Sequence, residues 1–141
     1  MDMNSLDRFV LAQRDTYATA LREIRSGKKR SHWMWYIFPQ LRGLGMSINA
    51  YTYGINGASE AMAYLKHPLL SARLIEITEA LLSLDGSDPV SVFGYTDAMK
   101  LRSSMTLFAT VSDMGSPFSR VLDKYYAGEM DEITLNMLKS D

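Results

Sequence analysis

The side chains best suited to chemistry lie in one short block, residues 31–40, which reads SHWMWYIFPQ. It contains both tryptophans, one of the two histidines and two further aromatic residues. An indole ring can stack on a planar ligand and donate a hydrogen bond from its N–H group. An imidazole titrates near neutral pH and can act as a general acid or base. His32, Trp33 and Trp35 are therefore candidate ligand-binding residues.

Each of these residues also has a purely structural interpretation. Large aromatic side chains in a run without charges are usually buried, so the two tryptophans could form the centre of the core. His32 could equally be a structural histidine whose hydrogen bonds are satisfied. On either interpretation we expect Trp33 and Trp35 to be mostly buried.

The aromatic block lies inside a segment without any Asp or Glu, residues 24–59, which we call the acid-free segment. In proportion to the 16 acidic residues among 141, a segment of this length should hold about four. Carboxylates near an anion-binding site would repel the ligand, so their absence has a physical reason there. Arg42 is the only formally charged residue within 31–59. Its guanidinium can grip an oxyanion through two N–H groups, or it can stack on an aromatic ring.

A second cationic block without carboxylates, residues 100–106, reads KLRSSMT. On a helix its cations and hydroxyl groups could hold an anion near the helix start, where backbone N–H groups are free. They could also form an ordinary solvated helix face. Lys100, Arg102 and Ser104 are the candidates here, and we expect this block and the acid-free segment to meet around one anion-accepting pocket.

The composition excludes several classes of protein. Without cysteine there are no disulfides or thiolate metal sites, and no metal, dinucleotide or serine-nucleophile motif is present, so no metal or cofactor is expected. A formal net charge of −1 gives no overall footprint for nucleic acid, which is not expected as a partner. Neither a signal peptide nor a run of about 18 apolar residues is found. We therefore expect a cytoplasmic protein that does not enter a membrane.

Helical spacing and helix-start signals repeat along the chain, and no stretch shows the alternation of a strand. The sequence predicts an all-α fold, one compact multihelical domain over residues 1–141 with about seven or eight short helices. A short buried helix over 32–38 is favoured over a strand because only Ile37 there is β-branched. The pairs that combine a cap residue with proline, and so mark helix starts, are His67-Pro68, Asp88-Pro89 and Ser116-Pro117.

The remaining predicted helices are defined by their caps and apolar spacing. The helix over 69–84 should bury one face, formed by Leu70, Leu74, Ile77 and Leu81. The others run from Asn4 or Ser5 to Gly27, from Ser47 through Tyr53, over 58–66, from Thr96 or Asp97 to about Val111, over 118–127, and from Asp131 through Leu138.

Several long motifs resemble those of a mostly bacterial family known as domain of unknown function 1810. They are residues 27–40 (GKKRSHWMWYIFPQ), 43–47 (GLGMS), 67–69 (HPL), 100–108 (KLRSSMTLF) and 118–135 (FSRVLDKYYAGEMDEITL). The likeness covers about 6–138 and implies a compact multihelical fold without an established activity. The name calpastatin, sometimes attached to such sequences, belongs to a disordered inhibitor, whereas this chain is 47% hydrophobic and patterned for a packed core.

Taken together, the residues favour binding of a small anionic ligand such as a nucleotide, with catalysis on that ligand left open. The expected contacts are His32, Trp33, Trp35, Arg42, Lys100, Arg102 and Ser104. The alternative is a non-catalytic protein-interaction or regulatory module, in which the aromatic block is core and the basic loop at 28–30 faces a partner. The first function requires the two blocks to line one concave site, whereas a scattered arrangement favours the second.

Overall fold

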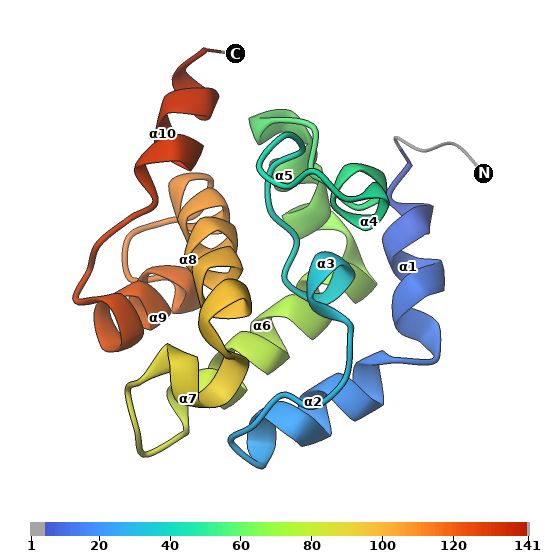
Figure 1. Cartoon of the computed structure of the whole chain (residues 1–141). Coiled ribbons are helices and arrows are strands. Elements are labelled where there is room, and N and C mark those ends of the chain that lie inside the picture. Colours follow the sequence, from blue (N-terminus) through green and yellow to red (C-terminus); the bar gives the residue numbers. More distant parts are fainter. Residues whose placement is uncertain (1–4, 141) are drawn as a thin grey trace.

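The computed structural model describes residues 5–140, which form ten α-helices joined by short loops (Figure 1). The β-type pairing among these residues is limited to one isolated bridge between Leu41 and Ile55. The all-α prediction is therefore confirmed, although ten helices replace the expected seven or eight. The helices are α1 (Asp7–Arg14), α2 (Tyr17–Arg25), α3 (Met34–Ile37), α4 (Ile48–Thr52), α5 (Ala58–Lys66), α6 (Pro68–Leu82), α7 (Pro89–Phe93), α8 (Tyr95–Thr110), α9 (Pro117–Tyr126) and α10 (Glu132–Lys139).

The first predicted helix is in fact two helices, α1 and α2, which meet at an angle at Asp15 and Thr16 (Figure 1). Asp and Thr are poor residues for a helix interior, because their side chains compete for the backbone hydrogen bonds. The break lets α1 pack against α3 while α2 packs against α6. Gly27 ends α2 in the left-handed region at φ +85°, as predicted, and Asn4 lies outside the described residues.

Five of the predicted helix starts are confirmed by their hydrogen bonds. Each cap side chain accepts a hydrogen bond from a backbone N–H in the first turn of its helix, which satisfies one of the donors that a helix start leaves free. Ser47, His67, Asp88, Ser116 and Asp131 act in this way, with donor–acceptor distances of 2.9–3.2 Å. The predicted caps Ser5 and Thr96 or Asp97 are wrong, because α1 begins after Leu6 and α8 begins after Gly94, neither with a capping side chain.

Helix α6 runs through the middle of the molecule and contacts α2, α5 and α9 (Figure 1). The four residues predicted for its buried face, Leu70, Leu74, Ile77 and Leu81, are each at most 1% exposed. The two sides of the fold, α1 and α2 on one and α8 and α9 on the other, are thus packed around one apolar helix.

A buried arginine that no sequence pattern singled out joins α1 to the start of α5. Arg8 is 1% exposed, and all five of its N–H donors are used. They bond the carbonyls of Ser5, Thr52 and Gly54 and both carboxylate oxygens of Glu60, at 2.7–3.2 Å. Because the pair is buried, removing either charge would leave the other without a partner.

Replacing Arg8 should therefore be strongly destabilising. We expect Arg8→Leu to lower the free energy of unfolding by about 3–5 kcal/mol, because Glu60 is left as an uncompensated buried charge. Arg14→Leu is the matched control on the same helix, since Arg14 is exposed and lies 4.0 Å from Asp15. Urea denaturation of both variants measures the difference, and equal losses would show that the Arg8 network adds nothing to stability.

Candidate functional site

The basic loop after α2 is organised by a carboxylate one residue before the acid-free segment. Glu23 is 8% exposed, and its Oε1 accepts hydrogen bonds from the backbone N–H groups of Arg30 at 2.8 Å and Ser31 at 3.0 Å. The indole N–H of Trp33 donates to the same oxygen at 2.9 Å, and the Ser31 hydroxyl donates to Oε2 at 2.5 Å. The loop therefore closes around Glu23.

The hydrogen bonds decide the charge state of Glu23. Burial alone raises the pKa of its carboxyl, but the bonds from Ser31, Arg30 and Trp33 stabilise the charged form more strongly. The pKa is lowered from its ordinary value of 4.5 to about 2. Glu23 is thus a permanent anion at neutral pH, held by donors rather than by a cation.

Side chains in the loop alternate between the surface and the interior. Lys29 faces inward, with its Nζ 2.9 Å from an Asp97 carboxylate oxygen and 5.0 Å from the Trp33 ring centroid. Ser31 and Trp33 also face inward, toward Glu23. The exposed side chains between them are those of Lys28, Arg30 and His32. The candidate His32 is therefore a surface residue beside two cations.

The two tryptophans lie in different environments. Trp33 is completely buried among aromatic rings, including those of Phe38 and Phe93, which confirms its expected burial. Trp35 is only half-buried, and the Nζ of Lys100 lies 5.2 Å from its ring centroid. Trp33 is thus unavailable for stacking on a ligand, whereas one side of Trp35 is covered by a lysine.

Trp35 and Lys100 are the point at which the acid-free segment meets the 100–106 block. With Met34, Phe38, Gln40, Ala50, Tyr53 and Gly54 they line a depression of about 10 Å³. That volume holds at most about one water molecule. Lys100 also lies 3.6 Å from Asp97, which pairs with Lys29. The two blocks are therefore neighbours, but the space between them is too small for an organic ligand.

The other polar residues of the 100–106 block face α10. The Ser103 hydroxyl donates to the Asp131 carboxylate at 3.2 Å, and the Asp131 backbone N–H donates to the Thr106 hydroxyl at 2.9 Å. The Arg102 guanidinium lies 3.9 Å from the same carboxylate. Asp131 in turn caps α10. The anion beside this strip is thus a carboxylate of the protein itself. Ser104 is fully buried, and its hydroxyl has no hydrogen-bond partner among the described residues.

Arg42 borders a larger hollow of about 420 Å³, which we call the Arg42 hollow. The Leu41–Ile55 bridge brings Arg42 beside the start of α5, with the Arg42 N–H donating to the Ile55 carbonyl at 2.9 Å. Its side chain is positioned by Tyr51, whose carbonyl accepts from Nε at 2.9 Å and whose ring lies 4.9 Å below the guanidinium. The hollow is lined by Leu41, Arg42, Ile55, Asn56, Gly57, Ala58, Ser59 and Met137.

Among residues 5–140, no carboxylate lines the Arg42 hollow. Three other hollows, of about 550, 590 and 270 Å³, each include at least two carboxylates. The start of α5 faces the hollow without a capping side chain, because its N-cap is Gly57 at φ +91°. Sequence reasoning missed Asn56 and Ser59 as neighbours of Arg42, because only the bridge brings them together.

Residues 5–140 include neither a candidate metal site nor a helix that could span a membrane. No three His, Asp or Glu side chains there are grouped so that they could hold a metal ion. In the same part of the chain, every helix is too short or too polar to cross a membrane.

Glu23 should make stability depend on pH. Its pKa is lower in the folded protein than in the unfolded chain, so its contribution is complete above about pH 4.5 and is lost as the pH falls toward 2. The full shift corresponds to about 3 kcal/mol, and solvent screening beside this surface loop reduces the expected value to about 2 kcal/mol. Glu23→Gln should therefore be less stable than wild type at pH 7 and approach it near pH 2, as urea denaturation would measure. An exposed control, Glu79→Gln, should show no such convergence, and a constant deficit of Glu23→Gln at every pH would contradict the assignment.

Comparison with known proteins places this architecture in a family. No curated protein is significantly similar to the chain. The chain is similar to the conserved hypothetical protein Rv1873 from Mycobacterium tuberculosis, whose crystal structure has 47% sequence identity and a TM-score of 0.94, covering 98% of this chain and 99% of that one. A family model described as protein of unknown function (DUF1810) matches residues 3–138. The resemblance of the motifs is thereby confirmed, and the chain belongs to the DUF1810 family.

Proposed function

We propose that the protein binds a small anionic ligand, such as a nucleotide, in the Arg42 hollow. The observation that carries this proposal is that one hollow combines a guanidinium with a helix start that no side chain caps, and that none of its described lining residues is a carboxylate. The guanidinium and the helix start each attract an oxyanion. A lining without a described carboxylate spares the anion the repulsion that it would meet in the other hollows.

The electrostatics around the hollow are consistent with an anionic ligand. The nearest carboxylate along the chain is that of Glu60, and both of its oxygens accept hydrogen bonds from Arg8. The buried Arg8 guanidinium therefore neutralises the charge of Glu60. The first turn of α5 presents backbone N–H groups and the positive end of the helix dipole beside the guanidinium of Arg42.

The size and the apolar part of the hollow suit a ligand larger than phosphate alone. Its volume of about 420 Å³ lies within the range of roughly 300–1,000 Å³ that is typical of small-molecule sites. The half-buried side chain of Met137 provides apolar surface against which a planar ring could rest, whereas Leu41 and Ile55 are at most 3% exposed. The six other candidate residues, His32, Trp33, Trp35, Lys100, Arg102 and Ser104, do not line this hollow. The shared pocket expected between the two blocks is therefore not formed, and this proposal rests on Arg42 and the start of α5 instead.

Calorimetric titration with phosphate, AMP and ADP tests the proposal. Arg42→Gln should weaken binding by about 10- to 100-fold, the usual loss for a hydrogen bond to a charged group. Ser59→Asp should abolish binding because it places a carboxylate at the helix start. The same change should stabilise the fold by about 0.3–1 kcal/mol through the helix dipole, so that lost binding could not be ascribed to unfolding.

The matched control is Arg120→Gln, because Arg120 is an exposed arginine on α9. It should bind like wild type. If wild type fails to bind all three ligands at millimolar concentration, or if Ser59→Asp binds as well as wild type, the proposal is wrong.

A second candidate function is protein interaction through the basic loop. The observation in its favour is that Glu23 holds the loop so that Lys28, Arg30 and His32 all face solvent, while Trp33 is core. A loop whose backbone is already fixed loses little conformational entropy when it binds. Its cationic side chains would suit an acidic segment of a partner protein.

A fluorescently labelled glutamate-rich peptide tests this second function by anisotropy at low ionic strength. The double variant Lys28→Ala/Arg30→Ala should weaken binding by about 2- to 30-fold, because each exposed ion pair contributes about 0.2–1 kcal/mol. Added salt should weaken wild-type binding as well. Arg42→Gln is the control and should leave this binding unchanged. Absence of wild-type binding, or equal loss in the control, would argue against the basic loop.

A further inference from the structure

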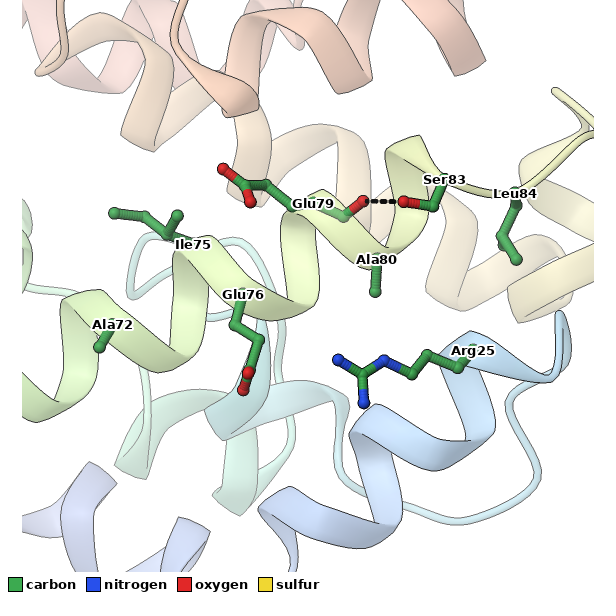
Figure 2. Close-up of a pocket in the computed structure, with 8 residues that line it drawn as sticks. All are labelled: Arg25, Ala72, Ile75, Glu76, Glu79, Ala80, Ser83 and Leu84. Atoms are coloured by element: carbon green, nitrogen blue, oxygen red, sulfur yellow. Dashed lines mark hydrogen bonds between the residues drawn. The ribbon is translucent and has the colours of Figure 1, made fainter.

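A second hollow, of about 550 Å³, lies between the end of α2 and one face of α6. Figure 2 shows Arg25 extending from α2 toward α6, while Glu76 on α6 points into the same space. Glu79 also lines the hollow, but its carboxylate is directed away from Arg25. One positive and one negative group therefore face each other across this hollow.

These two charges are not paired with each other. No ion pair or hydrogen bond joins Arg25 to Glu76 in the part of the chain that the structure describes. Elsewhere in the same part, Arg8, Lys29 and Arg102 all lie within 4 Å of a carboxylate oxygen. The hollow thus keeps opposite charges apart, whereas Arg8, Lys29 and Arg102 are paired with carboxylates.

The Glu76 carboxylate is held in place by Tyr17 of α2, the helix that packs against α6. The Tyr17 hydroxyl donates to Glu76 Oε1 at 2.5 Å and lies 3.0 Å from the Arg73 carbonyl. The guanidinium of Arg73 lies 5.2 Å from the Tyr17 ring centroid and completes the packing. Burial, and after it the bond to Glu76, raise the pKa of Tyr17 above its ordinary value of 10, so the hydroxyl keeps its proton and remains a donor. The carboxylate is therefore oriented before any ligand arrives.

We propose that this hollow binds a zwitterion, specifically a free α-amino acid with an apolar side chain. Arg25 would bind the carboxylate through its planar N–H pair, and Glu76 would bind the ammonium group. Ala80, Ile75 and Leu84 provide apolar surface for the side chain. A simple anion would be repelled by Glu76 and a simple cation by Arg25, so only a ligand with both charges gains from both.

This site is separate from the Arg42 hollow and does not depend on the function proposed there. The two hollows share no lining residue. They also differ in the ligand that each selects, since the described lining of the Arg42 hollow includes no carboxylate and that of the second hollow includes two. Failure of either proposal would leave the other standing.

Three matched ligands test the charge requirement by NMR titration of the ¹⁵N-labelled protein. Leucine carries both charges, N-acetylleucine lacks the ammonium group and leucinamide lacks the carboxylate. We expect leucine to shift amide signals at the end of α2 and along α6, and to bind about tenfold more tightly than either analogue, the effect of one charged hydrogen bond. Equal affinity for all three ligands, or no shifts with leucine at millimolar concentration, would overturn the proposal.

Variants at the two charges assign each to its half of the ligand. Arg25→Gln should lose the preference for leucine over leucinamide, and Glu76→Gln should lose the preference for leucine over N-acetylleucine. The Gln side chain can still accept the Tyr17 hydrogen bond, so the local fold is preserved. Arg22→Gln is the control, because Arg22 is an exposed arginine on the same helix. If neither variant changes the preference for leucine over the two analogues, Arg25 and Glu76 do not contact the ligand, and the site is refuted.

Discussion

The fold depends above all on two largely buried carboxylates, Glu23 and Glu60, whose oxygens accept hydrogen bonds from other parts of the chain. Glu23 is the clearest case, because two backbone N–H groups, a hydroxyl and an indole N–H converge on it. Its position determines where the chain turns after α2 and where Trp33 enters the core. Glu60 plays the same part at the other end, where Arg8 binds both of its oxygens. The acid-free segment is thus bordered by two acids that hold it in place.

This arrangement gives the composition of the segment a structural explanation beside the functional one. An additional carboxylate between residues 24 and 59 would compete with Glu23 for the same N–H donors, or with Glu60 for Arg8. The same principle operates around Asp131, where side chains of α8 that look like an external anion site bind a carboxylate of the protein. The charged groups of these three networks therefore bind partners within the protein rather than an external ligand. Two cations of the segment, Arg25 and Arg42, instead border open hollows.

The parts of the structure that could be predicted are those set by neighbours along the chain. A cap followed by proline, as at His67-Pro68, works within one turn of helix, and the apolar face of α6 is visible in its spacing. The break at Asp15 was missed because tertiary packing, rather than propensity alone, decides whether two weak helix formers end a helix. Arg8 was missed because an isolated arginine near the start of a helix looks like any surface residue. Arg42 could be singled out by composition, but its partners depend on a bridge that no local pattern reveals.

The two carboxylate networks also differ in how far they reach along the chain. The partners of Glu23 lie within ten residues of it, whereas Arg8 and Glu60 are 52 residues apart. Closing a longer loop costs more chain entropy, so short-range contacts are favoured early in folding and long-range contacts form later. Glu23 therefore belongs with the contacts that can guide the chain as it folds. Arg8 belongs with the contacts that close a long loop, so we expect changes at Glu23 to act mainly on the folding rate and changes at Arg8 mainly on the lifetime of the native state.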